Sequence, residues 1–138
     1  MISRPQFQEF ALPYERRVID AIRKSGGYSK LHMCGNSSHI LTDLATNGAD
    51  IFNVDHMVDL GKAGEVYFAQ GHTVKGNVNP VTDLLSATPL HARAAASACI
   101  ATSRGKKYML GAGCEIPAAT PDEVFFAFAD AAYCLNQC

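Results

Sequence analysis

The chain has 138 residues, 48% of them hydrophobic and 18% charged, which is the balance of a folded domain rather than of a disordered chain. Twelve basic and thirteen acidic residues give a net charge of −1, so the charge does not favour nucleic acid or an anionic membrane as a partner. The apolar runs are too short to span a membrane, and the N-terminus has no charged-then-apolar leader, so we expect a cytoplasmic protein.

The hydrophobic pattern then alternates between helical and strand periodicity along the chain. A first helix is predicted over 5–24, kinked or split at Pro13. Four strands are predicted after it, at 28–34, 51–55, 73–77 and 107–113. Each strand is followed by a helical stretch. Asn36 or Ser37 is expected to cap the first, and the second covers 60–68. The third consists of a short helix at 81–85 and a longer one at 88–103. The last begins with a capping box of Thr120 and Glu123 and runs to about 135.

Four strands that each precede a helix predict an α/β fold with a parallel sheet and right-handed crossovers. Two architectures fit this order: an open four-stranded sheet, or part of a (β/α)8 barrel. A complete barrel needs about 250 residues, so this chain could supply about half of one. We expect one domain over residues 1–138, since no linker or low-complexity segment interrupts the pattern.

Polar side chains gather where the predicted strands end, at the edge where parallel α/β folds bind ligands. They are His32 and Cys34, Asp55 and His56, Asn77 and Asn79, and Cys114 and Glu115. The other histidines are placed elsewhere: His72 precedes its strand, and His39 and His91 fall on helices, where we expect them to be solvated. The remaining cysteines, Cys99, Cys134 and Cys138, also fall on helices.

His32 and Cys34 are two residues apart on a strand, so their side chains point to the same face. With Cys114 from the last strand they form a His-Cys-Cys set, which suits zinc with an open fourth position. Two thiolates and a neutral imidazole cancel the charge of Zn2+, so a further thiolate bound there stays electron-rich. Such a site would activate thiols better than water.

Simpler interpretations of these residues remain open. The odd number of cysteines favours reduced thiols, and buried free cysteines at strand ends are common. Cys34 and Cys114 could instead form a disulfide. Asp55 and Asn77 are candidates for orienting a polar substrate, but they could equally cap the following helix or tie a loop.

Several motifs, in order, resemble the C-terminal half of the uroporphyrinogen decarboxylase superfamily. They are His32-Met33-Cys34-Gly35-Asn36, Asn53-Val54-Asp55, Gly76-Asn77-Val78-Asn79-Pro80, and Gly111-Ala112-Gly113-Cys114-Glu115-Ile116-Pro117 with Thr120-Pro121. The pair of motifs that carry His32, Cys34 and Cys114 is closest to the methylcobamide:coenzyme M methyltransferase branch. That resemblance implies a TIM barrel in which these three residues bind zinc.

The implied reaction is methyl transfer from a methylated corrinoid, carried on a partner protein, to a zinc-bound small thiol. Asp55, His56 and Asn77 are then the candidate substrate-binding residues. Departures from the family pattern put substrate contacts in question, because Asn79 stands where the family usually has Asp and Val124 where it often has Asn. Ala112 stands where the decarboxylase branch typically has His, which disfavours decarboxylation.

Two other functions compete with this one. The first is decarboxylation of tetrapyrrole carboxylates, which needs basic residues near the site, whereas the arginines of this chain fall mainly on predicted helices. The second is a non-catalytic metal-binding or partner-binding module. Because the family's N-terminal half has no counterpart in this sequence, we also expect self-association or pairing with a separate N-terminal half to complete the barrel.

Overall fold

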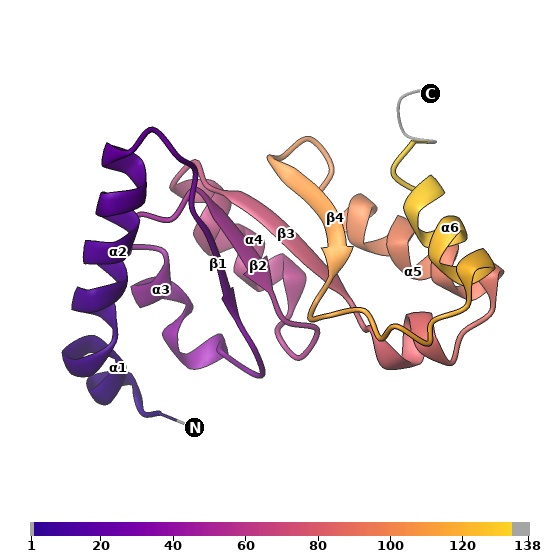
Figure 1. Ribbon diagram of the computed structural model, residues 1–138, viewed down its shortest axis with the longest axis horizontal. Coiled ribbons are helices and arrows are strands. Elements are labelled where there is room, and N and C mark those ends of the chain that lie inside the picture. The colour runs from indigo at the N-terminus through magenta and orange to yellow at the C-terminus, as the bar shows by residue number, and fades with distance from the viewer. Residues whose placement is uncertain (1, 134–138) are drawn as a thin grey trace.

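The computed structural model describes residues 2–133 (Figure 1). A four-stranded parallel sheet in the order β1-β2-β3-β4 forms its centre, which confirms the predicted α/β fold. The strands are β1 (Lys30–Met33), β2 (Ile51–Val54), β3 (Thr73–Val78) and β4 (Tyr108–Ala112). Strands adjacent in the chain are adjacent in the sheet, so all the carboxyl ends of the strands lie along one edge.

Helices connect and flank these strands. They are α1 (Arg4–Phe10), α2 (Leu12–Lys24), the 3-10 turn η1 (Ser38–Ile40), α3 (Leu41–Leu44), α4 (Leu60–Ala69), the π-helical turn η2 (Val81–Leu85), α5 (Pro89–Thr102) and α6 (Asp122–Asp130). In Figure 1 the helices α1, α2 and α3 stand at the β1 end, and α5 and α6 at the β4 end. No helix in the described part of the chain is long and apolar enough to cross a membrane.

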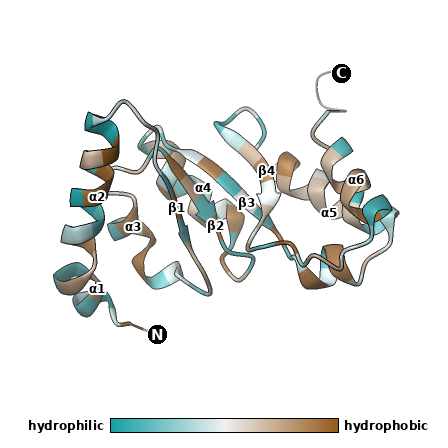
Figure 2. Cartoon of the chain, in the orientation of Figure 1, coloured by the Kyte–Doolittle hydropathy of each residue, from teal (hydrophilic) through white to brown (hydrophobic). Residues whose placement is uncertain are grey.

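One face of the sheet is covered by helices and the other carries polar side chains. Helix α4 packs on β2 and β3, and α5 packs on β3 and β4. Phe52, Val54 and Val74 are buried against these helices. Asn53 and Lys75, which alternate with them along β2 and β3, are half-buried. In Figure 2 the strands carry hydrophilic segments, coloured teal, beside hydrophobic ones, coloured brown. The strands therefore have the two-residue alternation of a sheet with one covered face.

The first predicted helix is split, as Pro13 suggested. The break lies at Ala11, because Pro13 occupies the first turn of α2, where a missing N–H costs nothing. Helix α1 is fixed to the rest of the molecule by Arg4, whose Nε donates to Oδ2 of Asp43 at 2.6 Å. Gln8 donates to the other oxygen of the same carboxylate at 2.7 Å.

Two capping predictions were wrong. Pro121, with ψ of 138°, is the N-cap residue of α6, so Thr120 lies one position too early to cap it and its buried Oγ1 has no hydrogen-bond partner. Ser37 does not cap the helix after β1, and Asn36 instead accepts from the Ser38 amide in a tight turn. Thr88 caps α5 as predicted. The last helix ends at Asp130, earlier than the predicted end near 135. Positions 134–138, which include Cys134 and Cys138, lie outside the described residues.

Candidate metal centre

Three predicted ligands come together at the carboxyl edge of the sheet. Nε2 of His32 lies 3.0 Å from Sγ of Cys34, and that sulfur lies 3.6 Å from Sγ of Cys114. His32 is in β1, and Cys34 is the first residue after that strand. Cys114 is the second residue after β4. The twisted sheet thus brings together side chains 80 positions apart in the chain.

A carboxylate belongs to the same cluster. One ligand atom each from His32, Cys34, Asp55 and Cys114 can be chosen so that all lie within 4.8 Å of one another. The Asp55 side chain is almost fully buried, and its oxygens accept from the amides of Gly35 at 2.9 Å and Met57 at 2.8 Å. Asp55 therefore also ties the loop after β1 to the loop after β2.

The separations within the cluster suit a tetrahedral metal. Zinc–sulfur and zinc–nitrogen bonds of about 2.3 and 2.0 Å put a nitrogen and a sulfur ligand roughly 3.5 Å apart and two sulfurs roughly 3.8 Å apart. The contacts of 3.0 and 3.6 Å are close to this range, so small side-chain rotations would admit an ion. Two sulfurs and an imidazole nitrogen are the ligand types that zinc prefers.

The ring of His32 is held from the neighbouring strand. His32 and Asn53 are partners in the register of β1 and β2, and Nδ1 of His32 lies 3.0 Å from the main-chain oxygen of Asn53. A carbonyl oxygen can only accept, so a proton on Nδ1 is stabilised there and Nε2 is left with its lone pair toward the sulfurs. The side-chain nitrogen Nδ2 of Asn53 lies 3.1 Å from the same Nδ1, and because it is a donor it would bond the other tautomer, so Asn53 orients the ring in either protonation form.

The electrostatics of the cluster oppose its own ionisation. The pKa of Cys34 is raised, first by its contact with Cys114, then by desolvation and by the negative charges of Cys114 and Asp55. Gathered anionic groups repel one another unless a cation lies among them. The cluster is therefore one that a divalent metal ion would stabilise.

The predicted substrate residues lie beside this cluster and are engaged in loop contacts. Asn77 donates from Nδ2 to the main-chain oxygens of Asp55 at 3.1 Å and Val58 at 2.7 Å. Nδ1 of His56 lies 3.2 Å from Oδ1 of Asp55. This is the loop-tying arrangement that the sequence left open for Asp55 and Asn77, and a role toward substrate for Asp55, His56 or Asn77 stays a prediction.

Other chemistry-bearing residues lie apart from the cluster. His72 contacts the main-chain oxygen of Ala45 at 3.0 Å and packs edge-on against Phe52. His39 and His91 are exposed, and Nε2 of His91 lies 2.9 Å from Oδ1 of Asp83. Asn79 caps its own turn by accepting from the amides of the two residues after Pro80.

The sequence analysis missed a set of cations next to the cluster. A cavity of about 340 Å³ on the open face of the sheet has both His32 and Cys114 in its wall, together with Lys30, Asn53, Lys75 and the acidic residue Glu115. The signal was present in the strand alternation. Lys30 precedes His32 by two positions, and Asn53 and Lys75 each stand between two residues of the covered face.

The sequence matches a known family along nearly its whole length. The family model of uroporphyrinogen decarboxylase (URO-D) matches residues 1–134. A uroporphyrinogen decarboxylase from Parasynechococcus marenigrum is 33% identical over 129 residues, which are 92% of this chain and 36% of that protein. The methylcobamide:CoM methyltransferase MtbA from Methanosarcina mazei is 31% identical over 116 residues, 83% of this chain and 32% of that protein.

A solved structure gives the same picture of the fold. A methyltransferase from Methanosarcina mazei superimposes with a TM-score of 0.87 at 25% identity, over 99% of this chain and 39% of that one. The chain thus spans about a third of the length of the relatives that it matches. The extent of these matches shows that the chain belongs to the uroporphyrinogen decarboxylase (URO-D) family.

Proposed function

We propose that His32, Cys34 and Cys114 bind zinc and that the site transfers a methyl group from a corrinoid protein to a small thiol. The observation that carries this proposal is the convergence of one imidazole and two thiol sulfurs, with separations of 3.0 and 3.6 Å, at the carboxyl edge of the sheet. Similarity to the methylcobamide:CoM methyltransferase MtbA supports the choice of reaction.

Each residue has a definite task in this proposal. Two thiolates and a neutral imidazole balance the charge of a dication, and Asn53 orients the imidazole. Asp55 holds the Cys34–Gly35 segment through the Gly35 amide. Zinc, when bound, would keep the sulfur of an added thiol deprotonated and nucleophilic. A corrinoid protein would approach the site from the carboxyl ends of the strands, where these residues lie.

Decarboxylation of tetrapyrrole carboxylates is the second candidate. One observation favours it, namely that Lys30 and Lys75 line the cavity beside the cluster and could hold carboxylates. Similarity to uroporphyrinogen decarboxylases is of the same size as that to MtbA. A third candidate is a metal-binding module without catalysis.

The strand arrangement bears on how the site would be completed. Among the described residues, β1 and β4 each have a strand neighbour on one side only. We propose that a second copy of the chain, or an N-terminal barrel half, pairs with these edges and encloses the open face. Light scattering on the purified chain, alone and with such a half, measures this; a lone monomer that gains no partner contradicts it.

Metal content and methyl transfer separate the candidate functions. We expect about one zinc per chain, lost in Cys34→Ser and retained in the control Cys99→Ser, whose sulfur lies on α5, contacts Asn77 and is not one of the clustered ligand atoms. Transfer from methylcobalamin to a thiol should follow zinc content. Zinc without transfer favours the non-catalytic module, and decarboxylation that needs no zinc favours the second candidate.

A further inference from the structure

The strand register and a glycine in β4 together fix the position of the Lys75 side chain on the open face of the sheet. The register pairs His32 with Asn53, Asn53 with Lys75, and Lys75 with Met109, so these residues form a row across the open face. Nζ of Lys75 lies 3.4 Å from Oδ1 of Asn53. A Cβ at Gly111 would come within 2.5 Å of that Nζ, so the glycine makes room for the ammonium group.

The ammonium group has no carboxylate partner within 4.0 Å among the residues that the structure describes. Burial lowers the pKa of Lys75, and the nearby charge of Lys30 lowers it further. The fold therefore carries an unfavourable charge on the wall of the cavity that also contains His32 and Cys114. Placing it there costs stability, which points to a use in the loaded site.

The charge of the loaded site supplies that use. A dication with two thiolates and a neutral imidazole is neutral, the Asp55 carboxylate in the same cluster adds one negative charge, and a bound thiolate acceptor adds another. We propose that Lys75 is the counter-charge of the thiol-loaded metal site, offsetting the negative charge that the acceptor brings. This inference rests on the proposed function. It makes Lys75 a positioning residue, because its ammonium acts through the field in the cavity and not by bonding to the reacting sulfur.

The positive charge of Lys75 acts differently on the two binding steps. Metal binding replaces two thiol protons by a dication, so the charge of the site stays the same and Lys75 affects this step little. The acceptor thiol loses its proton when it is held as a thiolate, so the site gains one negative charge, which Lys75 attracts. Replacing Lys75 by a neutral residue should therefore leave metal affinity nearly unchanged and weaken thiol binding. A side chain with a purely structural role would weaken both.

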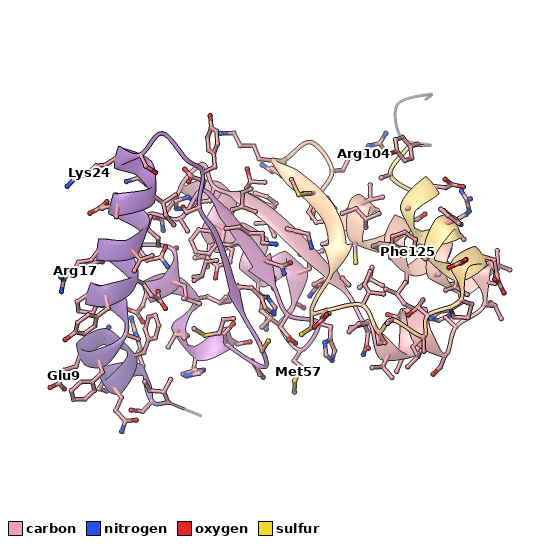
Figure 3. All side chains as sticks on the ribbon, in the orientation of Figure 1. Glu9, Arg17, Lys24, Met57, Arg104 and Phe125 are labelled. Carbon is pink, nitrogen blue, oxygen red and sulfur yellow. The ribbon has the colours of Figure 1, made fainter. Side chains whose placement is uncertain are left out.

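The experiment compares four variants of the full chain. Lys75→Met removes the charge and the hydrogen bond, Lys75→Gln keeps a donor for Asn53, and Lys75→Arg keeps the charge. Lys24→Met removes a charge from the far end of α2, well away from Met57 and the carboxyl edge in Figure 3. Co2+ replaces zinc as the probe, since its visible absorption reports both metal binding and thiolate ligation. The thiols are neutral 2-mercaptoethanol and anionic 3-mercaptopropionate.

For Lys75→Met and Lys75→Gln we expect a nearly unchanged affinity for Co2+ and binding of 2-mercaptoethanol that is about 3- to 10-fold weaker, as for one unit charge in a partly hydrated cavity. Lys75→Arg and Lys24→Met should match the parent chain. Constants that both stay unchanged, or that both weaken, overturn the inference while leaving the metal site intact. A loss confined to 3-mercaptopropionate also overturns it, since Lys75 would then bind the acid group. A parent chain that binds no metal removes the proposed function as well.

Discussion

Gly113 lies directly against the main chain of His56, so close that a Cβ at position 113 would come within 2.2 Å of the His56 amide nitrogen. The Gly113 amide also donates to the main-chain oxygen of Val78 at 2.8 Å. The residue after β4 is thus held between the loop that follows β2 and the last residue of β3. Because Cys114 comes next in the chain, this contact determines where its sulfur lies relative to Cys34.

Gly113→Ala should therefore damage the metal centre. Its methyl group would meet main-chain atoms of Asp55 and His56 that have no freedom to turn aside, so the Cys114 segment must move. We expect a loss of about 2–4 kcal/mol in the free energy of unfolding, the size seen for overpacking against backbone. Zinc affinity should fall at least tenfold, measured by competition with a chelator.

The matched control is Gly27→Ala, whose nearest neighbour would be the side-chain Cγ2 of Ile22 at 3.2 Å, with no main-chain atom closer than 3.5 Å. We expect it to leave zinc affinity unchanged. Parent-like zinc binding by Gly113→Ala would show that the close approach of β4 to the His56 segment does not determine the metal geometry.

A second prediction concerns the carboxylate of Asp43, which fixes α1 to the body of the fold. The hydrogen bond from Arg4 is the largest cause of its lowered pKa, and Gln8 lowers that pKa further. A carboxyl whose folded pKa lies below its ordinary value of 3.8 stabilises the fold above that value. The contribution is then lost as the pH falls through the lower folded pKa.

Asp43→Asn should lower the free energy of unfolding by about 1–2 kcal/mol at pH 7, because it removes a charge-assisted hydrogen bond. The difference from the parent chain should shrink below pH 3.8, where the carboxyl protonates in the unfolded chain first. Urea unfolding at pH 7 and pH 3 measures both values. Asp20→Asn, which breaks an exposed ion pair with Arg23, is the control and should change little. A constant difference at both pH values contradicts the assignment.

The central pair of the site could be predicted because it depends on local rules. His32 and Cys34 share a face by the two-residue period of a strand, and the four strand–helix units fix which strand ends meet at one edge. The second rule predicts the position of Cys114, because this residue comes just after the last strand. These steps need no knowledge of side-chain contacts.

The electrostatic surroundings could not be predicted in the same way. Lys75 reaches the cavity because β3 pairs with β2 in one register and because Gly111 leaves space above it, and both facts belong to tertiary structure. The prediction that Thr120 caps α6 was wrong for a related reason. Thr120 has a suitable side chain, but the backbone at Pro121 starts the helix one residue later.

Asn77 gives a third prediction, which distinguishes its two possible roles. Asn77→Ala removes the side-chain donor to the main-chain oxygen of Val58 and one of the two donors to that of Asp55, which keeps the Val58 amide, so we expect a loss of about 1–2 kcal/mol in the free energy of unfolding. Zinc affinity should fall several-fold as the loop loosens. Asn36→Ala, at an exposed turn, is the control. Unchanged stability with weaker thiol or corrinoid binding would instead make Asn77 a substrate contact.

The last prediction tests whether the two sulfurs are close enough to bond when no metal separates them. Sγ of Cys34 and Sγ of Cys114 are 3.6 Å apart, and a disulfide needs about 2.05 Å, a difference that small rotations supply. With hydrogen peroxide the metal-free chain should first form a sulfenic acid on one cysteine. The other thiolate then attacks it and expels hydroxide, leaving a Cys34–Cys114 disulfide and a mass lower by about 2 Da.

The reaction should quicken as the pH rises above the ordinary thiol range, because the pKa of Cys34 is raised and the thiolate is the reactive form. Bound zinc should suppress it, since the sulfurs are then occupied as ligands. Cys114→Ser should stop at the sulfenic acid or a higher oxide, and Cys99→Ser should behave like the parent chain. Peptide mapping by mass spectrometry measures these products; a metal-free chain that oxidises at both cysteines without joining them would place the sulfurs farther apart than the fold does.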